Sequence, residues 1–244
     1  MNSKKIAAFA VAATLALATQ AQAGSVNVAG NATQNGDGSI TLTNGGYYQA
    51  GAAWLASPYS TGQSWAETFS FSLVNNNGGT MADGIAFAIQ NRGNNVVGAA
   101  GGNIGYYGLG AIGSVVQTWG NNTVGLNLDG IPYDTAQNPF ETMGNNSVVT
   151  GTETVTYDAA NHTLGLTADI DGFSFSQLAS VDLTQLFGSS VYLGFTGGTG
   201  GATAVQTITS FTTPVPEAGT LSMMAAGLAL VGVMSRRRKQ SHAA

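Results

Sequence analysis

Acidic side chains are the first candidates for chemistry, because the 244-residue sequence has no cysteine and only two histidines. Hydrolysis of a glycosidic bond needs two facing carboxyl groups about 5–9 Å apart, which on a strand means acidic residues two or four positions apart. Glu153 and Asp158 are five positions apart and face opposite sides of a strand, whereas Asp169 and Asp171 flank an expected turn. Neither pair has the required spacing, so the sequence argues against an enzyme.

Nucleophilic and metal chemistry have as little support. Without cysteine there is no disulfide framework, no thiolate zinc site and no cysteine nucleophile. His162 is the only histidine of the central region, so a Ser-His-Asp triad has one candidate and no supporting pattern. Two groupings could supply oxygen ligands to calcium: Asn127 with Asp129 and Asp134, and Asp169 with Asp171. Neither has EF-hand spacing, and both suit hairpin turns.

The basic residues gather at the two ends of the chain. They are Lys4, Lys5, Arg92, Arg236, Arg237, Arg238 and Lys239. Between Gly24 and Glu217 twelve carboxylates stand against Arg92 alone, which leaves a formal charge of −11. A nucleic-acid-binding surface needs several Lys and Arg side chains to replace the counterions of the phosphates. The composition therefore excludes nucleic acid as a partner.

The first 23 residues have the organisation of a secretory signal peptide. Lys4 and Lys5 precede an almost wholly apolar run over 6–18, and small residues at 21 and 23 form a cleavage signal before Gly24. We expect a signal helix that is removed after Ala23. The mature chain would then be exported through a bacterial inner membrane.

The C-terminal end has the features of a membrane anchor. Ala218–Ser235 carries no charge and, as a helix rising about 1.5 Å per residue, is just long enough to cross a bilayer core. The basic cluster 236–239 would hold its far end in the cytoplasm and leave the main domain outside. Residues 213–217, just before the apolar span, contain two prolines and suit an extended linker or processing site.

The region between the two ends is expected to be all-β. Short segments alternate apolar and small or polar residues, as in 69–74 and 85–89, and Gly and Asn clusters separate them. Asp171-Gly172 lies between two such segments and predicts a hairpin turn. The only expected helix is short, over 182–187. Many strands without βαβ spacing favour one sandwich or barrel.

The C-terminal segment resembles the PEP-CTERM sorting tail of Gram-negative bacteria. The resemblance rests on Val215, Pro216 and Glu217, the apolar span and the terminal basic cluster, in this order, and assigns 214–240 to the tail. It implies recognition by an exosortase, cleavage near the Pro-Glu motif and transfer to the cell surface or extracellular matrix. The membrane would then hold the chain only before processing.

The central region resembles an L-type (legume-type) lectin domain. The matching motifs are Phe69-Ser-Phe-Ser-Leu73, Ala82-Asp-Gly-Ile-Ala-Phe87, Gly101-Gly-Asn-Ile-Gly105, Thr118-Trp-Gly-Asn121, Val124-Gly-Leu-Asn127 and Val191-Tyr-Leu-Gly-Phe195. The resemblance covers about 24–213 and implies a concanavalin-like jelly-roll sandwich of two antiparallel sheets. It also implies a sugar site in which Asp83 accepts hydrogen bonds from two hydroxyls. Gly102 and Asn121 would donate to the sugar, and Trp119 would lie under its ring.

The chain departs from this family at the metal site. Family members carry Val-Glu-Phe-Asp-Thr before the aromatic residue, and the Glu and Asp bind manganese and calcium. Here Val115 and Gln117 occupy those two positions, and the downstream ligand segment is shortened to Asn122-Thr123. Hard cations need several charged oxygens, so we expect no bound metal and a sugar site of low affinity.

Together these features predict an exported carbohydrate-binding protein of the cell surface or exopolysaccharide matrix. The acidic, lysine-free domain would repel anionic polysaccharides, so neutral or cation-bridged glycans are the expected ligands. The missing metal ligands leave one alternative open, a structural matrix protein that keeps the sandwich and has lost sugar binding.

Overall fold

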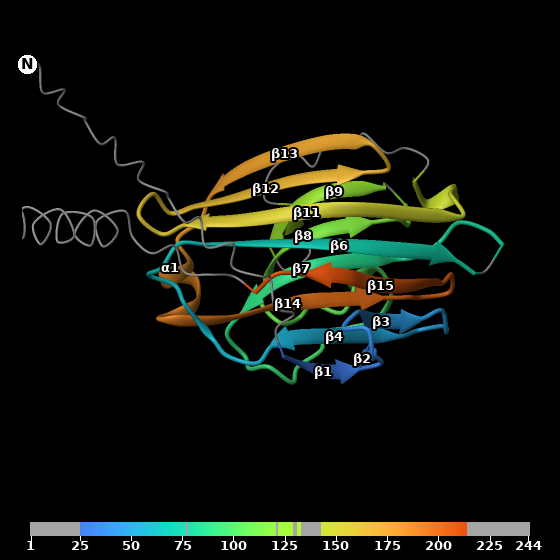
Figure 1. Cartoon of the computed structure of the whole chain (residues 1–244), viewed down its shortest axis with the longest axis horizontal. Helices are drawn as coiled ribbons and strands as arrows, with labels where there is room; N and C mark the ends of the chain where they lie inside the picture. Colours follow the sequence, from blue (N-terminus) through green and yellow to red (C-terminus); the bar gives the residue numbers. More distant parts are fainter. Residues whose placement is uncertain (1–24, 77, 121, 129–130, 133–142, 214–244) are drawn as a thin grey trace, which may run out of the picture.

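The computed structural model describes residues 25–213, apart from 77, 121, 129–130 and 133–142. Over these residues the chain forms two antiparallel sheets packed face to face, with the short helix α1 (Leu183–Phe187) at one end (Figure 1). Two single-turn 3-10 helices, η1 (Gly101–Asn103) and η2 (Met143–Asn145), interrupt the loops. The structure confirms the all-β jelly-roll sandwich that the sequence predicts.

The seven-stranded sheet has the strand order β13, β12, β11, β6, β15, β3, β2. The bounds in that order are Phe173–Ser180, Thr163–Ile170, Val148–Asp158, Trp65–Asn75, Ala204–Phe211, Ile40–Asn44 and Thr33–Gln34. Alternation along β6 sends Phe69, Phe71 and Leu73 into the sandwich and the serines between them outward. The predicted hairpin joins β12 to β13, and its turn residues Asp171 and Gly172 have φ of 50° and 83°.

The eight-stranded sheet has the order β1, β4, β14, β7, β8, β9, β10, with β5 paired to β14. The bounds in that order are Val26–Gly30, Ala50–Leu55, Ser190–Gly198, Gly84–Gln90, Ile112–Gln117, Thr123–Leu128 and Ile131–Pro132, and β5 is Tyr59–Ser60. Strand β7 lies between β14 and β8 and is buried along its whole length. The start of this central strand positions the candidate site.

Two apolar cores bury the two faces of β7. Between the sheets, Phe87 packs on Phe69 and Phe195, with ring centroids 5.9 and 5.8 Å away. On the opposite face Ala86 and Ala88 belong to a second cluster with Trp54. The alternation of large apolar residues along β7 indicates the first core only, because the second core is completed by the irregular segment that follows β7, which has no apolar period of its own.

The segment 91–111 covers this second core and is fixed by hydrogen bonds to the sheet. Trp54 Nε1 donates to Val96 O over 2.7 Å, and the side chain of Gln90 donates to Gly93 O over 2.6 Å. Arg92 Nε donates to Leu109 O over 2.8 Å. The one basic side chain of the central domain therefore fastens a loop.

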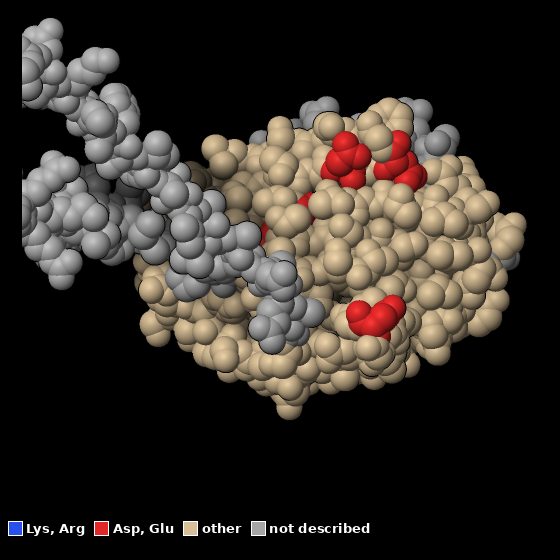
Figure 2. Space-filling view, in the orientation of Figure 1, with Lys and Arg blue, Asp and Glu red and all other residues tan. Residues whose placement is uncertain are grey.

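Charged side chains are sparse on the described surface. Figure 2 shows one face with no Lys or Arg in view and a few scattered acidic groups among the described residues. On the seven-stranded sheet the outward positions are largely hydroxyls, and two cross-strand pairs, Thr68 with Thr154 and Ser70 with Thr152, are hydrogen-bonded at 2.9 Å.

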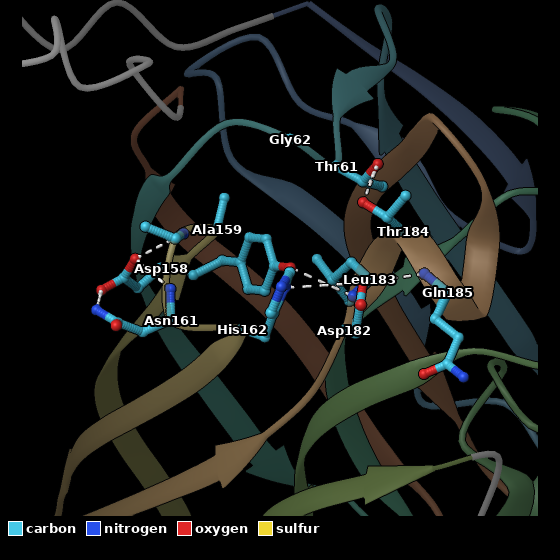
Figure 3. A network of polar contacts seen from close by, with 12 residues as sticks. Thr61, Gly62, Asp158, Ala159, Asn161, His162, Asp182, Leu183, Thr184 and Gln185 are labelled. Carbon is cyan, nitrogen blue, oxygen red and sulfur yellow. Dashed lines mark hydrogen bonds and ion pairs between the residues drawn. The ribbon is translucent and has the colours of Figure 1, made fainter.

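The helix expected over 182–187 is confirmed as α1, which begins after Asp182. The Asp182 carboxylate accepts a hydrogen bond from Gln185 N at 3.0 Å, as an N-cap (Figure 3). His162 Nδ1 lies 3.8 Å from the same carboxylate, and Asp158 caps its own turn by accepting from Asn161 (Figure 3). The histidine of the triad candidate thus lies beside a helix cap at one end of the sandwich.

Several expectations concern residues that the structure does not describe. They are the signal segment 1–23 with its cleavage point at Ala23, the Val215-Pro216-Glu217 motif and the apolar span Ala218–Ser235. Within the described part of the chain, no helix has both the length and the apolar character needed to cross a membrane.

Candidate functional site

Asp83 lies at the N-terminal end of β7, between the ends of the two neighbouring strands. Its amide donates to Gly198 O at the end of β14, and its carbonyl accepts from Thr118 N just after β8, both over 2.9 Å. The Ala82–Asp83 peptide bond is cis. Main-chain hydrogen bonds on both sides therefore fix Asp83 in the middle of the eight-stranded sheet, at the end where β7 begins.

Glycines approach the Asp83 carboxylate closely. A Cβ added to Gly200 would lie 3.1 Å from Asp83 Oδ2, and one added to Gly102 would lie 4.0 Å from Oδ1. The Gly101 amide donates to Thr199 O over 2.9 Å, which joins η1 to the turn after β14. The structure thus brings together Asp83 and Gly102, two of the four residues that the sequence places in one site.

The Asp83 carboxylate is poorly solvated. The residue is 5% exposed, and Oδ2 has no hydrogen-bond partner among the described residues. Burial raises the pKa of Asp83 to about 6. An unpaired buried carboxylate oxygen is costly and is best satisfied by an external donor.

Trp119 lies in the loop that follows β8. Its side chain is 47% exposed, whereas the other two tryptophans, Trp54 and Trp65, are buried. The preceding amide, Thr118 N, is the donor to Asp83 O, so the indole is anchored one residue from the Asp83 backbone. Asn121, the fourth predicted residue, falls outside the described residues.

A contact with η2 fixes the far end of the Trp119 loop. Asn122 Oδ1 accepts from Gly144 N over 2.8 Å, and Gly144 O accepts from Met81 N over 2.7 Å. A Cβ on Gly144 would overlap the Thr118 carbonyl oxygen, so glycine is required there. Since Met81 precedes Asp83 by two residues, η2 ties the loop to the strand that carries the carboxylate.

The residues at the family's metal-binding positions do not fit a metal ion. Val115 is buried in the apolar cluster with Trp54 and Ala86 and has no donor atom to offer. Gln117, at the end of β8, supplies at most a neutral amide oxygen, whereas calcium and manganese prefer carboxylates. Of the alternative calcium ligands, Asp129 and Asp134 lie outside the described residues.

Three other carboxylates among the described residues lie in a turn, on the outer face of a sheet and in the core. Asp171 Oδ1 accepts from Thr150 N in the β12–β13 turn, at 3.0 Å. A shallow hollow of about 440 Å³ on the outer face of the seven-stranded sheet contains a single carboxylate, Asp169. Glu153 points into the core, where it accepts from Ser114 at 2.6 Å and burial raises its pKa to about 7. These placements offer no facing pair on a described surface.

Sequence reasoning missed a second glutamate in the core. Glu67 points inward from β6 between Trp65 and Phe69, and both of its carboxylate oxygens are buried. Burial raises the pKa of Glu67 to about 9, although the side chain and backbone of Thr212 oppose this rise. The sequence does contain a signal for this burial, because Glu67 lies two residues before Phe69 and therefore points to the same side of the strand as Phe69 and Phe71.

A fixed carboxylate acceptor, a glycine amide beside it and an exposed indole are the groups that bind a sugar ring and its hydroxyls. On a jelly-roll sandwich they define a lectin-like domain. The chain belongs to the legume lectin domain family, whose model matches residues 14–215. A PEP-CTERM protein-sorting motif matches residues 214–239.

Solved legume lectins share the fold. The chain is 21% identical to the lectin from Bauhinia forficata in complex with GalNAc, with a TM-score of 0.69 over 78% of this chain and 93% of that one. It is 19% identical to a seed lectin of Lotus tetragonolobus, with a TM-score of 0.70 over 80% and 94%. For arcelin-5, a lectin-like defense protein from Phaseolus vulgaris, the values are 20%, 0.67, 78% and 92%.

Proposed function

We propose that this protein is an exported lectin that binds neutral glycans without a metal ion. The residues that would contact the sugar are Asp83, Gly102, Trp119 and Asn121. The observation that carries the proposal is the buried Asp83 carboxylate, whose Oδ2 lacks a described partner and whose neighbours are glycines. Sugar hydroxyls are suitable donors for such an acceptor, and the exposed Trp119 offers an apolar surface to the ring.

Metal independence is part of the proposal. In the family a metal ion organises the loop that carries the sugar-binding asparagine, but Val115 and Gln117 are unsuitable ligands here. The hydrogen bonds of Gly144 to Asn122 and Met81 would hold the same loop instead. The net charge of −11 between 24 and 217 favours a neutral glycan over an anionic one.

The route to the cell surface is the second part of the proposal. The signal segment would direct export, and Ala218–Ser235 would hold the chain in the inner membrane. An exosortase would then cut near Val215-Pro216-Glu217 and pass the domain to the cell surface or exopolysaccharide matrix. Support comes from the matched sorting motif over 214–239.

A glycan array tests the sugar site. The wild-type chain should bind at least one neutral glycan, and Asp83→Asn should lose that signal because one acceptor oxygen becomes a donor. Asp169→Asn, which changes an exposed carboxylate on the other sheet, is the matched control and should bind normally. Failure to bind any polysaccharide, including the matrix of the host cell, would refute the proposal. Loss of binding in EDTA would refute its metal-free part.

We also propose an alternative from another class, a structural matrix protein without sugar binding and without catalytic activity. It is favoured by the replacement of both acidic metal ligands by Val115 and Gln117. Under this alternative, the chain and Asp83→Asn would be retained in the extracellular matrix to the same extent. Under the lectin proposal, only the wild-type chain would be retained.

A further inference from the structure

A second exposed aromatic group lies near Asp83, in a loop on the β14 side of β7, whereas Trp119 follows β8 on the other side. The loop between β3 and β4 carries Tyr47 and Tyr48, which are 66% and 75% exposed. Tyr48 N donates to Gly200 O over 3.2 Å, and Tyr48 Oη lies 3.8 Å from the position of a Cβ on Gly201. Gly200 is the residue that approaches Asp83 Oδ2.

The sheet order sets the relative positions of the two aromatic groups. Asp83 is bonded to the end of β14 on one side and to Thr118, after β8, on the other. Tyr48 contacts the turn that follows β14, and Trp119 follows β8. Asp83 therefore lies between the two chain segments that carry the rings, at one end of the neighbouring strands β14, β7 and β8.

The Tyr48 loop is held in place before any ligand arrives. Thr199 Oγ1 donates to Gly46 O over 2.7 Å and accepts from Gln49 N over 3.0 Å. Gln49 Nε2 also donates to Asn44 Oδ1 over 2.7 Å, within the loop. Tyr48 itself has a φ of 54°, a left-handed conformation that is unfavourable for a side chain of this size. Surrounding hydrogen bonds thus keep a large ring exposed in a strained conformation, as is typical of binding loops.

We propose that Tyr48 forms a second subsite, which stacks on the next pyranose residue of a neutral glycan chain bound at Asp83. The inference rests on the proposed sugar-binding function and deepens it from a single sugar to an extended chain. A rigid aromatic ring presents apolar area at little entropic cost, and its hydroxyl beside Gly201 can bond to the sugar rim. Ligands longer than one residue would therefore bind more tightly than monosaccharides.

The test uses glucose, galactose and mannose and their oligosaccharides of two to six residues, with binding measured on the full chain. Tyr48→Ala should weaken oligosaccharide binding about five- to tenfold and leave monosaccharide binding unchanged. Tyr48→Phe keeps the ring and should restore most of the affinity. Tyr47→Ala is the matched control, a neighbouring exposed tyrosine that should bind like the wild type. A melting curve for each variant separates lost binding from lost folding.

The outcomes separate the subsite from the primary site. If Tyr48→Ala weakened the binding of monosaccharides and oligosaccharides equally, or weakened neither, the subsite would be overturned. In that case a loss of binding in Asp83→Ala would still support the proposed function. Binding that is indifferent to both substitutions would overturn both proposals. Absence of binding to every sugar of the series would overturn the subsite for chains of these hexoses, whereas the proposed function would be refuted only if every glycan of the array also failed to bind.

Discussion

Replacing Glu67 by glutamine should stabilise the protein at neutral pH and reduce the dependence of its stability on pH. Glu67 is buried, and burial raises its pKa from 4.5 to about 9 against the smaller opposing effect of Thr212. Because the folded-state pKa is the higher one, folding takes up a proton at any pH between these values. The contribution of Glu67 to stability is therefore most favourable below pH 4.5 and becomes less favourable as the pH rises towards about 9.

The magnitude follows from the distance between pH 7 and the unfolded pKa of 4.5. Over these 2.5 units at about 1.36 kcal/mol each, protonation of Glu67 costs up to ~3.4 kcal/mol of folding free energy at pH 7. Entry of water and local relaxation reduce this value in real cores, so we expect a gain of ~2–3 kcal/mol for Glu67→Gln. Glutamine matches the neutral acid in size, so no gain is expected at pH 4.5.

Urea unfolding at pH 4.5, 6, 7 and 8, followed by tryptophan fluorescence, measures the effect. The free energies of unfolding of the variant and the wild type should coincide at pH 4.5 and separate progressively above it. Glu153→Gln should show a smaller effect that levels off near pH 7, since its pKa is raised only to about 7. A gain of equal size at every pH, or no gain at pH 7, would refute the burial argument.

Four further results are expected. Asp158→Asn should destabilise the protein at pH 7 and lose its effect as the pH falls, because hydrogen bonds lower the pKa of that exposed carboxyl; urea unfolding measures this. Glycan affinity should fall about tenfold per unit below about pH 6, as Asp83 takes up a proton, and a flat titration profile would contradict this. Gly102→Ala should melt like the wild type but bind glycans at least about tenfold more weakly, because the added methyl group would lie 4.0 Å from Asp83 Oδ1, where the sugar is proposed to bind. Asn122→Ala should cost ~1–3 kcal/mol and increase acrylamide quenching of Trp119, whereas added calcium should change neither quantity.

The local pattern of the sequence predicts much of the fold. Alternation of apolar and polar residues identifies β6 and β12, Asp171-Gly172 identifies the hairpin between β12 and β13, and Asp182 marks the start of α1. Each of these signals depends only on residues close in sequence. The second core could not be predicted in this way. Its formation depends on the covering segment 91–111, and no period in β7 encodes that partner.

The candidate site divides along the same line. Asp83, Gly102 and Trp119 could be proposed from motifs, and the structure places the first two beside each other. Tyr48 could not be proposed, because only the turn after β14 brings it near Asp83. The loop contact between Asn122 and Gly144 is likewise tertiary, and the motif that replaces the metal ligands gives no indication of it.

The solitary arginine of the central domain also has a consequence for proteolysis. Trypsin cleaves only after Lys or Arg, so within residues 24–217 it has a single site, after Arg92. That bond lies in the segment fastened by Arg92 Nε to Leu109 O, and cutting it requires the segment to leave the second core. A domain of this composition should persist among extracellular trypsin-like proteases. Its one cut would report directly on the opening of the loop that carries Gly102.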